Sequence, residues 1–245
     1  LSTERQNRPT VTAHAYRLLR AFIKWANYQK KYQGIIHGDL AQDHNVRKMV
    51  PVSASKAGDC LQKEQLKNWF QAIRQLNNTV ASAYLQVLLL TGARREEIVS
   101  LRWSDVDFKW SSMRIKDKIE GERIIPLTPY VAHLLSALVQ TPNSDVNKED
   151  WVFRSNSKSG KIIEPRSAHN RALAKAELPH ISLHGLRRSF GTLAEWVEVP
   201  TGIVAQIMGH KPSALAEKHY RRRPLDLLRK WHEKIEIWIL EQADI

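Results

Sequence analysis

The part of the chain best suited to chemistry lies between His184 and Tyr220. His184 and Arg187 are three residues apart in a helical pattern, so both side chains project from one face. Gly209-His210 closes a second helical run, and Tyr220 follows ten residues after His210. Arginine binds phosphate oxygens bidentately, histidine moves or donates protons near neutral pH, and tyrosine can attack phosphorus. Together these residue types predict chemistry on a phosphodiester.

A second cluster lies earlier, in the stretch TGARREEIVSLRW that begins at Thr91. Arg94 and Glu97 are three residues apart on a predicted helix over 94–101, so their side chains can form an ion pair. Such a pair can be an ordinary surface contact worth about 0.3–0.5 kcal/mol, or it can hold the arginine toward another group. Taken alone, the pair favours the surface contact.

A β-hairpin is predicted from two short strands, 113–115 and 122–125, joined around Gly121. Lys116 and Lys118 lie near its tip. Lysines in such places are usually only solvated, although a lysine over a cleft is well placed to give a proton to a leaving alkoxide.

The elements that must position these residues are mostly helices. Helical patterns are predicted over residues 10–33, 61–76, 79–90, 94–101, 126–139, 165–176 and after Tyr220. Thr91-Gly92 is expected to end the helix over 79–90, because glycine suits the left-handed position after a helix C-terminus. Residues 103–108 are predicted to be a turn, and His169 is interpreted as a surface residue. The expected fold class is mainly α with a small antiparallel β-hairpin sheet (α+β).

A linker divides the chain. Residues 50–59 are small, polar and contain Pro and Gly, so we place the boundary there. This predicts a partial helical DNA-binding domain over 1–55 and a catalytic domain with a C-terminal tail helix over 56–245. The tail helix carries one apolar face that can pack on its own domain or on a neighbouring protomer, formed by Leu228, Trp231, Ile235 and Trp238.

Composition narrows the class of partner. The 245 residues include 38 Lys and Arg against 25 Asp and Glu, a formal net charge of +13, which favours nucleic acid ahead of an anionic membrane surface. The apolar runs are too short to cross a bilayer, so no membrane span is expected. The single Cys60 excludes an internal disulfide and fits a reducing cytoplasm. The chain opens without an initiator Met or a signal-peptide pattern, as a fragment would.

The order and spacing of these motifs resemble the catalytic domain of the tyrosine recombinases, in particular the phage and genomic-island integrases. The family pattern is Thr-Gly-x-Arg-x-x-Glu-(Ile/Leu) with Leu-x-Trp, a hairpin Lys before Val/Ile-Pro-Leu, His-x-x-Arg, Gly-His, and a Tyr nine or ten residues on. This sequence matches with TGARREEI, LRW, IPL, HGLR, GH and Tyr220. Counting back eight from Pro126 gives Lys118 as the hairpin lysine, with Lys116 as the alternative.

The resemblance implies a fold, a reaction and a set of roles. The implied catalytic residues are Arg94, Lys118, His184, Arg187, His210 and the nucleophile Tyr220, with Glu97 in support. The tyrosine would attack DNA and leave a 3′-phosphotyrosyl link and a free 5′-hydroxyl. The arginines would neutralise charge at phosphorus, His184 would act as a base, His210 would bind a non-bridging oxygen, and Lys118 would protonate the 5′ oxygen. Neither a metal nor another cofactor would be needed.

The implied partner is double-stranded DNA in a basic clamp, with four protomers in the active assembly, a free chain that can be monomeric, and accessory DNA-bending or directionality proteins. DNA contacts are expected from Arg17, Lys24, Lys116, Arg188 and Lys211. The enzyme would act on the bacterial chromosome in the cytoplasm, integrating or excising a phage or mobile element. The segment after the tyrosine would dock on an adjacent protomer.

Three alternatives differ from this interpretation. One is a type IB topoisomerase-like nicking and rejoining enzyme, and another is a catalytically silent DNA-binding relative. The third, a zinc site made from His184, His210 and His219, is disfavoured because no clear carboxylate or thiolate joins the histidines.

Overall fold

The structure is a computed structural model that describes residues 6–32, 34–35, 43–51, 58–117, 121–139, 150–163, 165–210 and 223–245. The chain divides into two compact units, Leu1–Ala57 and Gly58–Ile245, and each is described by itself. Four residues discussed above lie outside the described residues, namely Lys118, Lys211, His219 and Tyr220.

The first unit contains helices α2 (Pro9–Tyr28) and α3 (His44–Met49). Proline suits the start of α2, since the N–H that it lacks would have no partner in the first turn. The helix ends before residue 33, where the sequence had placed its end, because Gln29 adopts an extended backbone. The side chain of Asp43 accepts two backbone N–H bonds and so caps α3.

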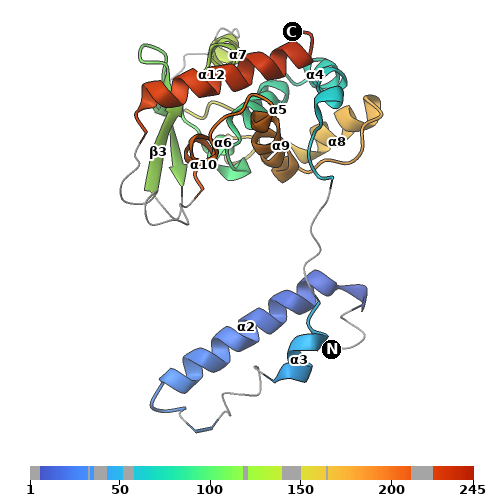
Figure 1. Ribbon diagram of the computed structural model, residues 1–245, viewed down its shortest axis with the longest axis vertical. Coiled ribbons are helices and arrows are strands. Elements are labelled where there is room, and N and C mark those ends of the chain that lie inside the picture. The colour runs from blue at the N-terminus through green and yellow to red at the C-terminus, as the bar shows by residue number, and fades with distance from the viewer. Residues whose placement is uncertain are drawn as a thin grey trace. The chain divides into compact units, whose positions relative to one another are not determined.

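The second unit is mainly helical, with one small antiparallel sheet (Figure 1). Its elements in chain order are η1 (Lys63–Gln65), α4 (Leu66–Arg74), α5 (Thr79–Thr91), α6 (Arg95–Val99), η2 (Trp103–Asp105), β1 (Val106–Asp107), β2 (Ser112–Asp117), β3 (Gly121–Pro126), α7 (Pro129–Val139), α8 (Arg166–Lys175), α9 (Leu183–Glu195), α10 (Thr201–Met208) and α12 (Leu225–Gln242). The expected fold class is confirmed. Among the described residues, no helix is long and apolar enough to cross a membrane.

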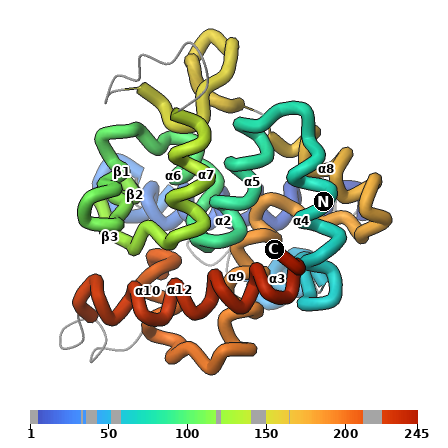
Figure 2. The backbone as a smooth tube through the Cα atoms, turned by 90° about the horizontal axis from the view of Figure 1, so that it is seen from above, coloured from blue at the N-terminus to red at the C-terminus, as the bar shows by residue number. Residues whose placement is uncertain are grey.

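Helix α5 is the centre of the second unit. Every residue from Ala81 to Thr91 is buried, and α4, α7 and α9 pack around it (Figure 2). Asn78 caps the start of the helix, and Gly92 ends it with φ of 58°, the left-handed conformation expected from the sequence. A Cβ at Gly92 would lie only 2.5 Å from the Phe190 ring, so α9 can approach α5 closely only because this residue is glycine.

The sheet has three strands in the order β1-β2-β3, rather than the two expected. Residues 103–108, predicted as a turn, form η2 and then β1, in which Val106 pairs with Met113. This turn prediction was wrong, because two residues are too few to show strand periodicity in the sequence.

Strand register places one face of the hairpin toward the core. Ile115 pairs with Arg123 across β2 and β3, and Asp117 pairs with Gly121. Since side chains alternate along a strand, Ile115 and Asp117 share a face of β2, and Arg123 shares its face of β3 with the buried Ile125. The hairpin therefore directs an acidic side chain, Asp117, and a basic side chain, Arg123, toward the interior.

The C-terminal helix α12 packs on its own unit, along β3, α10, α9 and α4 (Figures 1 and 2). Leu228 and Ile235 are buried in the core, and Trp231 and Trp238 are partly buried against it. Of the two arrangements that the sequence left open for this face, the structure shows packing on its own domain, and docking on an adjacent protomer stays a prediction. The apolar stripe is buried within its own chain, which a helical pattern by itself cannot show.

A buried carboxylate strengthens this attachment of α12. Glu236 accepts hydrogen bonds from the backbone N–H of Tyr130 at 2.8 Å and of Val131 at 3.3 Å, and from the Thr128 hydroxyl. Both N–H groups belong to the first turn of α7, where the helix dipole favours negative charge. Burial nevertheless raises the pKa of Glu236.

His169 on α8 is buried, so its interpretation as a surface residue was wrong. The Trp69 indole Nε1–H donates to His169 Nε2 over 3.0 Å, and burial lowers the pKa of this imidazole to about 4. A polar residue can enter a core when it gains a hydrogen-bond partner, and that partner comes from a helix 100 residues away in the sequence.

Candidate active site

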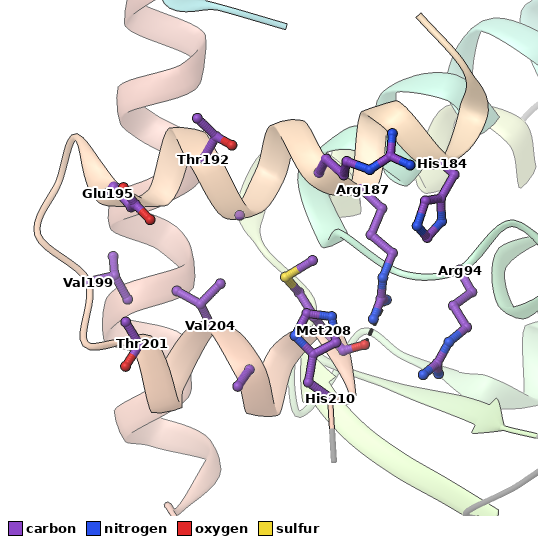
Figure 3. A pocket seen from close by; sticks show the side chains of 13 residues that line it. Arg94, His184, Arg187, Thr192, Glu195, Val199, Thr201, Val204, Met208 and His210 are labelled. Carbon is purple, nitrogen blue, oxygen red and sulfur yellow. Dashed lines mark hydrogen bonds between the residues drawn. The ribbon is translucent and has the colours of Figure 1, made fainter. Parts of the chain in front are cut away.

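A pocket of about 730 Å³ lies between α9 and α10, and it brings together residues from three separate motifs (Figure 3). His184 and Arg187 come from α9, His210 follows α10, and Arg94 precedes α6. The remaining lining residues are Arg188, Gly191, Thr192, Glu195, Val199, Thr201, Val204, Ala205 and Met208. Four of the six residues expected to be catalytic therefore share one pocket.

Arg187 is the most buried of the four. Its Nη1 donates to the carbonyl oxygens of Gly92 at 2.7 Å and Met208 at 2.8 Å, and Figure 3 shows the second bond. Both carbonyls lie at helix C-termini, where the helix dipole favours a cation. Burial and then the nearby Arg94 charge lower the pKa of Arg187 to about 10, so the guanidinium keeps its charge at neutral pH. The protein thus holds a cation at a fixed position.

Arg94 is held by three groups from different parts of the chain. Its Nη1 donates to Glu97 over 2.8 Å and to the Asp117 carboxylate, and its Nη2 donates to the Gly209 carbonyl over 3.1 Å. The side chain is 42% exposed. Arg94 therefore presents charge to the pocket while its orientation is set by the hairpin and by the end of α10.

Glu97 is buried and holds two arginines in place, whereas its spacing from Arg94 favoured an ordinary ion pair at the surface. Its carboxylate accepts from the Arg94 backbone N–H at 2.7 Å and from the Arg123 guanidinium through two bonds of 3.0 and 2.8 Å. Burial alone would raise the pKa of Glu97, but the bonds from Arg123 and Arg94 outweigh it and lower that pKa. Glu97 therefore remains a carboxylate that joins two arginines.

The two histidines, His184 and His210, line the pocket and are both exposed. Burial lowers the pKa of His184, helped by the charges of Arg188 and Arg187, and burial lowers that of His210, helped by Arg187 and Arg94. Both shifts favour the neutral imidazole, in which one ring nitrogen donates a hydrogen bond and the other can accept a proton.

The start of α9, which carries His184, is fixed by the segment that opens the second unit. Ser182 caps the helix by accepting from the Gly185 N–H at 3.0 Å, and Asp59 accepts from the N–H and the hydroxyl of Ser182, each at 2.7 Å. A Cβ at Gly185 would meet the Asp59 carboxylate at 2.3 Å. Glycine at this position lets Asp59 approach the helix.

Two residues of this site, Arg123 and Asp117, were missed by the sequence analysis. The signal was present in the strand alternation, because Arg123 stands two residues before the core residue Ile125 and Asp117 two residues after the core residue Ile115. The alternation shows that these two charges face inward, but it cannot show which carboxylate or guanidinium each of them contacts.

Lys116 and Arg188, both expected to touch DNA, have acidic partners in the structure. Lys116 lies on the face of β2 opposite to Asp117, and its Nζ is 2.8 Å from an Asp105 carboxylate oxygen. This geometry disfavours Lys116 as the hairpin lysine. Arg188 donates to the carboxylate of Asp59 and, at 3.3 Å, to its carbonyl.

Arg17 and Lys24 are exposed on α2 in the first unit, as a DNA contact requires. No group of three or more His, Cys, Asp or Glu side chains arranged to hold a metal is found within the described residues.

Comparison with known proteins shows the family of the chain. A model of the phage integrase family matches residues 59–224, and a model of the phage integrase core-binding domain matches residues 1–48. The chain belongs to the phage integrase family. The family expected from the sequence is thereby confirmed, and the matched range contains every residue of the predicted catalytic set.

Among its relatives, the chain is 90% identical over all of its 245 residues to prophage integrase IntF of Escherichia coli K12, and covers 53% of that protein. It is 27% identical over 157 residues to tyrosine recombinase XerC of Chlamydia caviae, an alignment that covers 61% of the chain and 49% of XerC. The chain therefore spans about half the length of these two relatives.

A solved structure shares the fold. The integrase of transposon Tn1549 in complex with circular intermediate DNA superposes with a TM-score of 0.61 at 16% identity, over 89% of this chain and 76% of the other. At this identity the similarity shows the fold.

Proposed function

We propose that this chain is the DNA-cleaving part of a site-specific recombinase that integrates or excises a phage or mobile element. The supporting observation is the convergence of Arg94, His184, Arg187 and His210 on one pocket in a phage integrase family chain. Two fixed cations, with two imidazoles whose neutral forms are favoured, suit a phosphodiester whose negative charge grows as it is attacked.

In the proposed reaction, the Tyr220 oxygen forms a bond to phosphorus and the bond from phosphorus to the 5′ oxygen breaks. The phenol proton passes to neutral His184, and Lys118 gives a proton to the departing 5′ oxygen. Arg94 and Arg187 neutralise the charge on the non-bridging oxygens, so these steps need no metal. A 5′-hydroxyl from a partner strand then reverses the sequence.

Double-stranded DNA is the proposed substrate, contacted by Arg17 and Lys24 of the first unit and by Arg188 and Lys211 of the second. Strand exchange would need four protomers on DNA, acting on the bacterial chromosome in the cytoplasm, and accessory DNA-bending proteins could assist. The division into a partial core-binding domain over 1–55 and a catalytic domain over 56–245 is part of this proposal.

Covalent trapping tests the proposal. When the protein is incubated in chelator with a duplex that carries a nick or a 5′-bridging phosphorothiolate in a candidate core site, we expect a denaturation-resistant protein–DNA adduct. A sulfur leaving group needs no proton, so the adduct should accumulate even where proton donation is slow. Peptide mapping should place the DNA on Tyr220.

The same assay separates the alternatives. DNA that is bound but never joined to protein, with nicked and phosphorothiolate substrates alike, would contradict the proposal and favour the catalytically silent relative. If the protein forms the adduct and also relaxes supercoiled plasmids whatever their sequence, the topoisomerase alternative is indicated. Strand exchange that depends on a defined site and on protein assembly supports the recombinase.

The pH dependence of cleavage should report the lowered pKa of His184. A base must be neutral to accept a proton, so the rate should decline as pH falls, with a midpoint below 6.5, the ordinary histidine value. Single-turnover adduct formation between pH 5 and 8 measures this. The decline should persist in His210→Gln, in which the proposed base is intact, and a midpoint at or above pH 6.5 would contradict the assignment.

A further inference from the structure

We infer that Arg123 is a positioning residue that holds the two ends of the phosphate-binding site, Arg94 and Gly209-His210, in register with each other. This inference rests on the proposed function and adds to it a residue that never touches the DNA. Arg123 projects from β3 on its core-facing side, and its side chain is only 15% exposed.

The guanidinium of Arg123 contacts Glu97 side-on. Nη1 and Nη2 each donate to a different oxygen of the Glu97 carboxylate, at 3.0 and 2.8 Å, in the fork geometry that only arginine provides. The same carboxylate accepts from the backbone N–H and the guanidinium of Arg94. Arg123 therefore fixes the carboxylate that in turn aims Arg94.

The third donor of Arg123 reaches α10. Its Nε donates to the Ile207 carbonyl at 3.0 Å, two residues before Gly209. Gly209 has φ of 72°, and a Cβ there would lie 2.6 Å from Arg123 Nη1 and 2.7 Å from Cζ. The guanidinium thus lies directly against the backbone that leads into His210, and glycine at this position leaves room for it.

All three nitrogens of the Arg123 guanidinium therefore take part in joining β3 to Glu97 and to the end of α10. Arg94 closes the arrangement by donating to the Gly209 carbonyl at 3.1 Å. Loss of Arg123 would leave the buried Glu97 with Arg94 as its remaining charged partner, and would pull the Arg94 guanidinium toward that carboxylate and away from the pocket. A misplacement of about 1 Å in such a group can cost on the order of 10²-fold in rate.

The test uses two substrates and a matched control. Single-turnover adduct formation is measured with a normal phosphate and with a methylphosphonate, which lacks the negative charge that Arg94 is placed to neutralise. We expect Arg123→Ala to lose about 10²-fold with phosphate and clearly less with methylphosphonate. Arg123→Lys keeps the charge but loses the fork, so it should also be slow.

Arg114→Ala is the control. Arg114 lies on the other face of the same hairpin, its side chain is 51% exposed, and its ion pair with Glu122 is long, at 3.9 Å. The Arg114→Ala variant should cleave both substrates at the wild-type rate. Wild-type rates in both Arg123 variants, or an equal loss on both substrates with a lowered melting temperature, would overturn the inference.

A measurement on the free protein does not depend on cleavage. In histidine-selective NMR spectra, the His210 ring signals, assigned with His210→Gln, should move in Arg123→Lys and stay in place in Arg114→Lys. Unmoved His210 signals would overturn the inference. A wild-type chain that forms no adduct would instead count against the proposed function, while its NMR result still decides the role of Arg123.

Discussion

Replacing Tyr220 by phenylalanine is expected to abolish the covalent adduct while leaving DNA affinity nearly unchanged. The substitution removes one hydroxyl, which is the nucleophile, and changes no charge. Affinity for DNA depends mainly on the number of phosphates that Lys and Arg neutralise, so it should hold at the same salt concentration. Gel electrophoresis under denaturing conditions measures the adduct, and fluorescence anisotropy measures binding.

Tyr130→Phe is the matched control for this experiment. The Tyr130 hydroxyl donates to Gln86 over 2.7 Å on α5 and is not part of the pocket. This variant should form the adduct as the wild type does. An adduct that persists in Tyr220→Phe would assign the nucleophile to another residue and contradict the proposed reaction.

Arg187→Ala is expected to reduce cleavage by at least about 10²–10³-fold, the usual cost of removing one preorganised donor that stabilises developing charge. The side chain is buried and its Nη1 makes two carbonyl bonds, so no neighbouring group can take its place. Arg187→Lys should fail as well, because an ammonium cannot reproduce a planar guanidinium held between two helix ends.

The measurement for Arg187 is the single-turnover rate of adduct formation at saturating DNA. Because the carbonyls of Gly92 and Met208 lose their donor, each at a cost of about 1–3 kcal/mol, thermal unfolding must show that the variant is folded at the assay temperature. Arg171→Ala, an exposed arginine on α8, should cleave normally. A folded Arg187→Ala chain with near wild-type rates would remove this residue from the reaction.

The residues expected to do the chemistry were recognisable because their types and order carry the information. His184 and Arg187 lie three apart, and Gly92 and Gly209 sit where helices must end in a left-handed residue. Most helices and the hairpin were likewise predictable, since their hydrophobic periods repeat over enough residues to be detected. The catalytic roles themselves remain predictions until the assays above are made.

Other features became visible only when distant segments met. Glu97 looked like half of a surface pair, and its burial depends on Arg123, which arrives from a strand 26 residues away. His169 looked exposed, and it is buried because Trp69 donates to it from another helix.

The family, the fold class and the residues that we propose as catalytic could all be predicted from the sequence. Three features required the folded structure, namely which charges are neutralised in the interior, the packing of α12 on its own unit, and the way Arg123 joins Glu97 to the end of α10. The physical reason is that periodicity specifies which face of an element points inward. Whether a charge on that face is tolerated depends on the partner that another element brings to it.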